Sequence, residues 1–292
     1  MQGTIVKGVG GFYYIRTEDA GLYECRARGI FRSRGEKPLP GDHVTIEPID
    51  REKMVGNITT ILPRYNELIR PAVANVTQGL VVFAAAAPEP NLNLLDNFLV
   101  MMAVKKIRTV LVFNKIDLAG QEKLSALADI YSRCGCEILF LSALNREGIG
   151  AVQALLPGKI TVLAGPSGVG KSSLVNLLIP GAEAETGGLS KKIDRGKNTT
   201  RHTELFGTEQ DGYLIDTPGF SSFLVEDMEP EQLGKYFPEF APFEAECRFT
   251  GCTHRNEPDC GVKEALERGD ISRSRYENYL QIYERLAQRK RY

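Results

Sequence analysis

The spacing of hydrophobic and polar positions changes twice along the chain, near residue 68 and near residue 229. Residues 1–68 hold short runs of strand-forming residues, separated by glycines and by turn signals such as LPGD at residues 39–42. Short strands without a helical period are typical of a small β-barrel. We expect an OB-fold there, with an SH3-like barrel as the alternative.

Residues 69–228 alternate between apolar strand-like runs and segments with helical spacing. NLLDNFLVMMAVKK (93–106) and QEKLSALADIYSRC (121–134) have the spacing of amphipathic helices. This alternation predicts a parallel sheet covered by helices, the α/β class. Its expected strands are GLVVFAAAA, TVLVFNKIDL, EILFLSAL, KITVLAG and GYLIDTPGF.

Residues 229–292 form a third segment, with a cluster of cysteine and histidine followed by two helical stretches, VKEALERG and SRYENYLQIYERLAQRKRY. The pattern therefore divides the chain into three domains, 1–68, 69–228 and 229–292. A length of 292 residues accommodates two or three domains.

The amino-acid composition limits the class of protein but does not by itself indicate a function. Hydrophobic residues make up 42%, charged residues 25%, and the formal net charge is −1, so no global positive field indicates nucleic acid. The first residues lack the pattern of a signal peptide, and the longest apolar run (79–87) is about half a membrane span. We expect a cytoplasmic monomer without membrane contact.

The sequence GPSGVGKS has the form of a phosphate-binding loop between a strand and a helix. Successive backbone N–H groups of such a loop, with the helix N-terminus, bind phosphate oxygens. Lys171 is expected to reach the β- and γ-phosphates, and Ser172 to bind Mg²⁺. The predicted nucleotide contacts are Gly165, Pro166, Ser167, Gly168, Val169, Gly170, Lys171, Ser172 and Ser173.

The sequence NKID identifies the base as guanine. Asp117 can accept hydrogen bonds from guanine N1–H and the 2-amino group, which adenine lacks, so adenine would leave the carboxylate unpaired. Lys115 is expected to pack its stem along the base. With Asn114, the loop at Ser142 and Ala143 completes the predicted base-binding set.

Two further elements are expected to sense the γ-phosphate. In DTPG, Asp216 would hold the Mg²⁺ shell and Gly219 N–H would contact the γ-phosphate. Thr200, with Thr199 as the alternative, would close on Mg²⁺ and the γ-phosphate in the GTP state and release after hydrolysis. Lys171, Asn198, Thr200 and Gly219 are the predicted catalytic residues, and Ser172, Thr200 and Asp216 the predicted Mg²⁺ ligands.

The order of these motifs is circularly permuted. In an ordinary GTPase the phosphate loop comes first and the base-reading loop last, whereas here the base-reading loop precedes the phosphate loop. Because termini of compact domains often lie close together, relinking them can preserve a fold. The segment that responds to hydrolysis then leads directly into the C-terminal segment.

Cys247, Cys252, His254 and Cys260 supply three thiols and one imidazole within fourteen residues. Such a set suits a closed, tetrahedral, structural Zn²⁺ site, and disulfides are the alternative. Bound zinc would stabilise a segment too small to have a core of its own. We predict one structural Zn²⁺ per chain.

The permuted motif order, the N-terminal barrel and the C-terminal Cys/His cluster together resemble the family of ribosome small subunit-dependent GTPase A (RsgA, also called YjeQ or YloQ). The resemblance covers essentially the whole chain, and the family's zinc site has the same spacing. It implies a GTPase that binds the small ribosomal subunit and its rRNA, is stimulated by it, and acts late in its maturation.

The chain departs from that family at the position before the threonine pair. Asn198 stands where family members often carry a histidine proposed to act in hydrolysis, and an asparagine can orient water but not act as a base. His202 is the alternative for that role. Phe220 stands where Ras-like enzymes carry the glutamine that orients water.

Basic residues suggest where RNA binds. Arg26, Arg28, Arg32, Arg34 and Lys37 flank Phe31 in the barrel, and arginine with an aromatic side chain suits RNA, although a solvated hairpin has the same pattern. Residues 191–201 are also basic, which would place RNA against the loop that senses the γ-phosphate.

Three functions are compatible with these motifs. The first is GTP hydrolysis that times release from the small subunit. The second is a GTP-locked RNA-binding assembly factor in which hydrolysis is incidental. The third, a P-loop kinase of small metabolites, is disfavoured by NKID and by the lack of an arginine-bearing lid segment.

Overall fold

The computed structural model describes residues 1–19, 21–29, 31, 35–69, 71–179, 203–208, 211–215, 225 and 228–289. The backbone divides into two compact units. The first comprises Met1–Gln78, Val152–Leu163 and Ser172–Phe220. The second comprises Gly79–Ala151, Ala164–Lys171 and Ser221–Tyr292.

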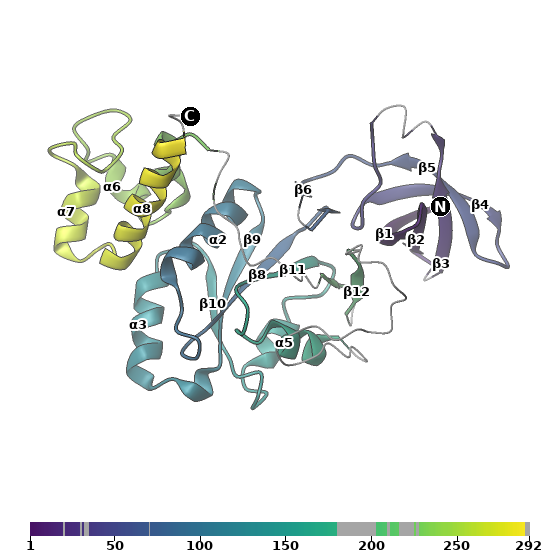
Figure 1. Cartoon of the computed structure of the whole chain (residues 1–292), viewed down its shortest axis with the longest axis horizontal. Helices are drawn as coiled ribbons and strands as arrows, with labels where there is room; N and C mark the ends of the chain where they lie inside the picture. The colour runs from purple at the N-terminus through teal and green to yellow at the C-terminus, as the bar shows by residue number, and fades with distance from the viewer. Residues whose placement is uncertain are drawn as a thin grey trace. The chain divides into compact units, whose positions relative to one another are not determined.

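The first unit begins with a closed five-stranded barrel (Figure 1). Its strand order is β1-β2-β3-β5-β4, with β3 and β5 parallel and the other pairs antiparallel. This closed order is that of an OB-fold, so the SH3-like alternative is wrong. The strands are β1 (Gln2–Val9), β2 (Phe12–Thr17), β3 (Leu22–Ala27), β4 (His43–Asp50) and β5 (Val55–Ile61).

The barrel core follows from alternation along its strands. Ile5 pairs with Ile15 in the β1–β2 hairpin, and both side chains are fully buried with Val44 and Ile58. Phe31 belongs to the same cluster and is only 4% exposed. The suggestion that Phe31 stacks on RNA beside the arginines is therefore wrong, because its ring fills the barrel.

Outside the barrel, the first unit contributes neighbouring strands of a sheet in the order β11-β13-β12. β11 (Ile160–Ala164) and β13 (Tyr213–Ile215) are parallel, whereas β12 (Leu205–Gly207) is antiparallel to β13 and was not expected from the sequence. An ion pair of 2.8 Å joins Lys7 of β1 to Glu204 beside β12. The remaining elements are β6 (Glu67–Leu68), β7 (Val73–Ala74) and α5 (Lys171–Leu178).

The second unit contains the predicted alternation of strands and helices. Its strands lie in the order β10-β9-β8, and β9 and β10 are parallel. β8 is buried along its whole length, as expected for a central strand. The elements are β8 (Gln78–Ala84), α2 (Leu92–Val104), β9 (Arg108–Asn114), η1 (Ile116–Leu118), α3 (Gln121–Tyr131), β10 (Glu137–Phe140) and α4 (Ile149–Gln153).

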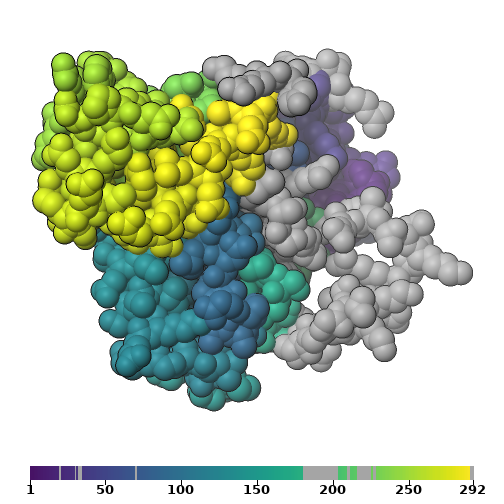
Figure 2. All heavy atoms as spheres, turned by 60° about the vertical axis from the view of Figure 1, so that its left-hand side comes forward, coloured from purple at the N-terminus to yellow at the C-terminus, as the bar shows by residue number. Residues whose placement is uncertain are grey.

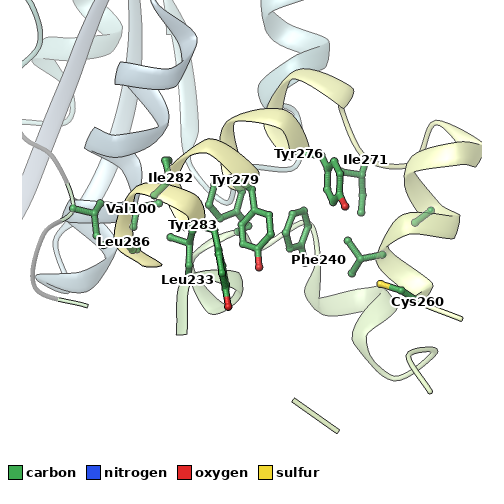
Figure 3. Close-up of a cluster of buried hydrophobic side chains, with 14 residues drawn as sticks. Val100, Leu233, Phe240, Cys260, Ile271, Tyr276, Tyr279, Ile282, Tyr283 and Leu286 are labelled. Atoms are coloured by element: carbon green, nitrogen blue, oxygen red, sulfur yellow. The ribbon is translucent and has the colours of Figure 1, made fainter. Parts of the chain in front are cut away.

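The C-terminal part of the second unit is helical, with η2 (Pro230–Tyr236), α6 (Ala241–Glu244), α7 (Gly261–Arg268) and α8 (Arg273–Arg289). Aromatic side chains of α8 form its core with Leu233 and Phe240 (Figure 3). Phe240 and Tyr279 meet edge to face at 5.0 Å between ring centroids. Val100 of α2 belongs to the same cluster, so this core is shared with the helix that follows β8.

Helices α2 and α8 also meet through buried polar groups, and Figure 2 shows the yellow C-terminal helix against the blue segment that includes α2. The Arg275 guanidinium is 1% exposed and binds Asp96 of α2 and Glu239, at 2.5 and 2.6 Å. Asn278 donates to the other oxygen of Asp96 at 2.6 Å. We call Asp96, Glu239 and Arg275 the buried ion cluster; it was not predicted from the sequence.

No helix among the described residues is both long enough and apolar enough to cross a membrane.

Candidate nucleotide and metal sites

The predicted phosphate loop connects β11 to α5. Gly165 leaves β11 at a φ of +142°, and a Cβ there would lie 2.0 Å from the Val82 carbonyl oxygen of β8. A side chain at this position is therefore excluded by the neighbouring strand. Lys171 opens α5, and its ammonium group donates to the carbonyl oxygens of Gly165 and Pro166, at 2.8 and 2.6 Å. These bonds hold the lysine over the loop, where phosphate oxygens would replace the carbonyls.

The other residues of the loop lie as the motif requires. Ser167 and Gly168 are exposed, whereas Val169 is buried below them. Ser172 and Ser173 lie in the first turn of α5, half-buried. A helix N-terminus that follows an exposed glycine-rich turn can bind anionic groups through its unpaired N–H groups.

Asn114 connects the predicted base-reading loop to the phosphate loop. It is 1% exposed at the end of β9, and its Nδ2 donates to the Val169 carbonyl oxygen at 2.8 Å. Its Oδ1 accepts from the Ala143 backbone N–H at 3.0 Å. We call these two hydrogen bonds of Asn114 the Asn114 latch. A Cβ on Gly170 would lie 2.3 Å from Asn114 Nδ2, so the latch requires a glycine at position 170. Asn114 therefore holds three loops in place.

The residues expected to read guanine surround this latch. The Ser142 hydroxyl donates to the Asp117 carboxylate and accepts from the Asn145 N–H at 3.1 Å. Lys115 has a left-handed backbone (φ +63°), and its ammonium group donates to the Ala87 carbonyl oxygen at 2.6 Å. Asp117 remains exposed at the surface, so its second oxygen can accept from a ligand.

Several predicted residues lie outside the described part of the chain. These are Asn198, Thr200, His202, Asp216, Gly219 and Phe220, together with the basic residues between 191 and 201. Of the three expected Mg²⁺ ligands, Ser172 is described, at the start of α5. The structure thus brings together the loops expected to bind base and phosphate.

The predicted zinc ligands converge in one site. One donor atom from each of Cys247, Cys252, His254 and Cys260 lies within 4.8 Å of all the others. The Cys247 and Cys260 sulfurs are 3.8 Å apart, and His254 Nδ1 lies 3.6 and 3.5 Å from them. A tetrahedral zinc ion would give about 3.8 Å between sulfurs and about 3.6 Å between sulfur and nitrogen. The donor set therefore fits Zn²⁺.

Neighbouring groups hold the zinc loop in shape. Burial lowers the pKa of His254, which favours the neutral imidazole that binds metals. Glu257 accepts from the Thr253 N–H and hydroxyl at 2.7 and 2.6 Å, and from the Arg255 N–H at 2.9 Å. Although burial acts in the opposite direction, these bonds hold the pKa of Glu257 at about 2. Tyrosine hydroxyls of α8 bind the carbonyl oxygens of Thr253 and His254.

The basic positions of the barrel are partly paired within the protein. Arg28 forms an ion pair with Glu47, and the Arg26 guanidinium lies 4.6 Å above the Phe12 ring. Both side chains and Lys37 are exposed, whereas Arg32 and Arg34 lie outside the described residues. The barrel surface thus offers exposed cations, but its aromatic partner is Phe12 rather than Phe31.

The glycine-rich turn is exposed at a helix N-terminus and is joined by Asn114 to an NKID loop that precedes it in the chain. Together with the OB-type barrel, this arrangement defines a circularly permuted P-loop GTPase. Comparison with known proteins gives the same class. The family model described as RsgA GTPase matches residues 61–226, and the RsgA N-terminal domain matches residues 2–56. The chain belongs to the RsgA GTPase family and is a GTP hydrolase.

Relatives and solved structures match along nearly the whole chain. Proteins of Agathobacter rectalis and Alkaliphilus metalliredigens, each named small ribosomal subunit biogenesis GTPase RsgA, are 49% and 45% identical, covering 100% of this chain and 100% and 99% of their own. YjeQ from Thermotoga maritima has a TM-score of 0.86 at 37% identity, covering 98% of both chains. YloQ, a circularly permuted GTPase, has a TM-score of 0.83 at 35% identity, covering 99% of this chain and 95% of its own.

Proposed function

We propose that this GTPase binds the small ribosomal subunit and its rRNA, that the subunit stimulates GTP hydrolysis, and that hydrolysis times release late in subunit maturation. The latch at Asn114 carries the nucleotide part of the proposal, since one side chain ties the guanine-reading loops to the phosphate loop. The names of the relatives support the partner, because they are described as small ribosomal subunit biogenesis GTPases.

In this proposal the division of the chain is 1–68 for RNA binding, 69–228 for GTP and 229–292 for zinc. Asp117 reads guanine, the loop Gly165–Ser173 holds the phosphates, and Lys171 neutralises charge on the transferred phosphoryl group. Ser172, Thr200 and Asp216 would hold the Mg²⁺ that GTP carries. Gly219 and Thr200 sense the γ-phosphate, and Asn198 orients water.

Zinc has a structural role in the proposal. Four protein ligands close a tetrahedral site, which leaves no position for a reacting water. The ion would fix the loop between α6 and α7 against α8, through the tyrosine hydroxyls that bind its backbone. We propose that the protein acts as a monomer in the cytoplasm, with GTP and GDP as its small ligands.

The deciding experiment measures GTP turnover with and without purified small ribosomal subunits. ATP serves as the control nucleotide, Lys171→Ala as the inactive variant and Lys105→Ala, an exposed lysine at the end of α2, as the matched control. We expect the small subunit to stimulate turnover of GTP but not of ATP, both in the unaltered chain and in Lys105→Ala. GTP binding without stimulation would instead favour the GTP-locked RNA-binding factor, and phosphate transfer to an acceptor other than water would favour a kinase.

A further inference from the structure

A cavity of about 360 Å³ lies within the first unit, between the barrel and the starts of β11 and β13. This volume is in the range of small-ligand sites. Its lining combines rings, a cation, an anion and a hydroxyl, and includes Thr4, His43, Tyr65, Lys159, Asp211 and Tyr213. The phosphate loop follows the other end of β11, which is five residues long, so the strand separates the two places by roughly 15 Å.

Hydrogen bonds fix the wall of the cavity that comes from the barrel. Thr4 and His43 are paired across β1 and β4, and the Thr4 hydroxyl is hydrogen-bonded to His43 Nδ1 at 3.1 Å. The Tyr65 backbone N–H donates to Asn75 Oδ1 at 2.8 Å, and Asn75 Nδ2 donates to the Gly41 carbonyl oxygen at 2.9 Å. A buried amide therefore holds Tyr65 to the barrel, while Tyr65 itself is 67% exposed.

The opposite wall supplies an ammonium group. Lys159 Nζ donates to Gln78 Oε1 at 3.2 Å, and Gln78, which is fully buried, donates in turn to the Leu155 carbonyl oxygen at 3.1 Å. The amide thus positions the lysine but does not neutralise it. Within the described part of the chain no carboxylate forms an ion pair with Lys159, so its remaining N–H groups can bind an anion.

Tyr213 and Asp211 lie beside this lysine. The Tyr213 backbone N–H donates to the Lys159 carbonyl oxygen at 2.8 Å. Burial raises the pKa of Tyr213, Arg16 opposes the shift and Asp211 adds to it, so the phenol stays protonated at neutral pH and can donate a hydrogen bond. Asp211 is exposed and its carboxylate is an acceptor. The cavity therefore offers a cation, a donor and an acceptor close to aromatic rings.

This combination suits one nucleotide of a single RNA strand. An unpaired base stacks on tyrosine or histidine, a phosphate binds an ammonium group, and base amino groups or ribose hydroxyls donate to a carboxylate. We propose that the cavity binds one unpaired nucleotide of RNA, with its base against His43 and Tyr65 and its phosphate at Lys159. The inference rests on the proposed RNA partner and adds a specific site to it.

The exposure of the lining favours an RNA strand over a free nucleotide. His43, Tyr65 and Asp211 are all exposed, whereas a site for a small free ligand encloses most of that ligand. One ammonium group also matches the single charge of a backbone phosphate, and Asp211 would repel the further charges of a di- or triphosphate. OB-folds bind strands mainly on the face of their second and third strands, whereas this cavity uses β1 and β4.

The test measures binding of a short, fluorescein-labelled oligoadenylate to the intact, zinc-loaded protein by fluorescence anisotropy. GDP and Mg²⁺ are kept in excess, so that the guanine site is filled. Tyr65→Ala should raise the Kd about 5- to 150-fold, the range for loss of one base–aromatic stacking contact, and Tyr65→Phe should bind as the parent chain does. Ile69→Ala is the matched control, because Ile69 is 80% exposed on the same segment but does not line the cavity.

The phosphate contact has its own signature. Lys159→Gln should weaken binding and reduce the slope of log K against log salt concentration by about 0.7, the value for one phosphate contact on a single strand. Lys105→Ala, at the end of α2, should leave that slope unchanged. An oligomer of abasic nucleotides should bind the parent chain and Tyr65→Ala equally weakly, and adenosine monophosphate should compete poorly with the oligoadenylate.

Several results would overturn the proposal. These are oligoadenylate binding by Tyr65→Ala and Lys159→Gln that matches the parent chain, no measurable binding by the parent chain, and an abasic oligomer that binds as tightly as the oligoadenylate. Equal competition by adenosine monophosphate would instead identify a free-nucleotide site and would overturn the RNA assignment.

Cosedimentation with purified small ribosomal subunits separates failure of this site from failure of the proposed function. If the parent chain sediments with the subunits while the variants bind oligoadenylate normally, only the cavity assignment is wrong. If the parent chain does not sediment with the subunits, the proposed function is wrong, and the oligoadenylate series still decides whether the cavity binds RNA.

Discussion

Replacing Arg275 with methionine tests how the C-terminal helix is held in the second unit. The guanidinium is almost completely buried and binds two carboxylates, Asp96 and Glu239, which are 0% and 4% exposed. Methionine keeps much of the volume and the contact with the Phe237 ring, over which the guanidinium lies at 4.6 Å. The substitution therefore removes charge and hydrogen bonds while it changes packing little.

The magnitude follows from the burial of the partners. Removing one member of a buried ion pair costs about 3–5 kcal/mol, because the remaining charge is left unpaired. The unfolding equilibrium constant should then rise by a factor of roughly 10² to 10⁴. The triple variant Asp96→Asn, Glu239→Gln, Arg275→Met should recover much of this loss, since it leaves no buried charge.

The pH dependence gives a second, independent signature. Burial raises the pKa of Asp96, and Arg275 opposes that shift. Without Arg275 the folded-state pKa of Asp96 rises further above its ordinary value of 3.8. A carboxyl with a raised pKa binds its proton more tightly when folded, so the variant loses stability as the pH rises from about 4 through that raised pKa. The loss in free energy of unfolding of Arg275→Met, relative to the parent chain, should be largest near pH 8 and smaller near pH 4.5.

Urea unfolding followed by tyrosine signals provides the assay. The chain has no tryptophan, and Tyr276, Tyr279 and Tyr283 lie in the core shared by α2 and α8, so near-ultraviolet circular dichroism reports on this region. A loss of less than about 1 kcal/mol, or a deficit that does not change with pH, would refute a buried, energetically important ion cluster.

Four further changes test the nucleotide and zinc sites. Asn114→Ala removes two hydrogen bonds of about 1 kcal/mol each, so GTP affinity measured with a fluorescent analogue should fall about 10- to 100-fold. Gly170→Ala places a Cβ 2.3 Å from Asn114 Nδ2 at a φ of +93° and should abolish GTP binding with far-ultraviolet circular dichroism unchanged. Cys252→Ser should release zinc to a colorimetric chelator much faster than the parent chain, and equal rates would contradict the four-ligand site. Glu257→Gln should also speed the release of zinc. Because the pKa of Glu257 lies below its ordinary value of 4.5, the contribution of its carboxylate to stability is complete above about pH 4.5 and is lost as the pH falls towards 2.

The fold was predictable where local pattern and burial agree. The all-buried run at β8 and the amphipathic run at α2 predicted a strand and a helix, and the structure has both. Phe31 was misassigned because an aromatic residue between arginines has the same sequence pattern whether it faces solvent or the barrel core. β12, three residues long, is too short to give a periodic signal.

The candidate sites were predictable in their motifs but not in their connections. NKID and the phosphate loop name Asn114, yet only the fold shows that its side chain binds Val169 and Ala143 rather than solvent. The buried ion cluster joins residues far apart in the chain, so no short stretch of sequence contains all three of them. One signal was present: Asp96 is a charge on the apolar side of the helical run 93–106, and a charge there requires a partner.

The permuted order has a consequence for protein synthesis. Because the chain is made from its N-terminus, Asn114 leaves the ribosome before both of its partners, Ala143 and then Val169. Strand β8 is likewise synthesised before Gly165, which packs against its backbone. A nascent chain that already carries the complete NKID loop therefore has no latch and no phosphate loop. The loops expected to bind base and phosphate can therefore be joined only after the segment that follows β11 has emerged.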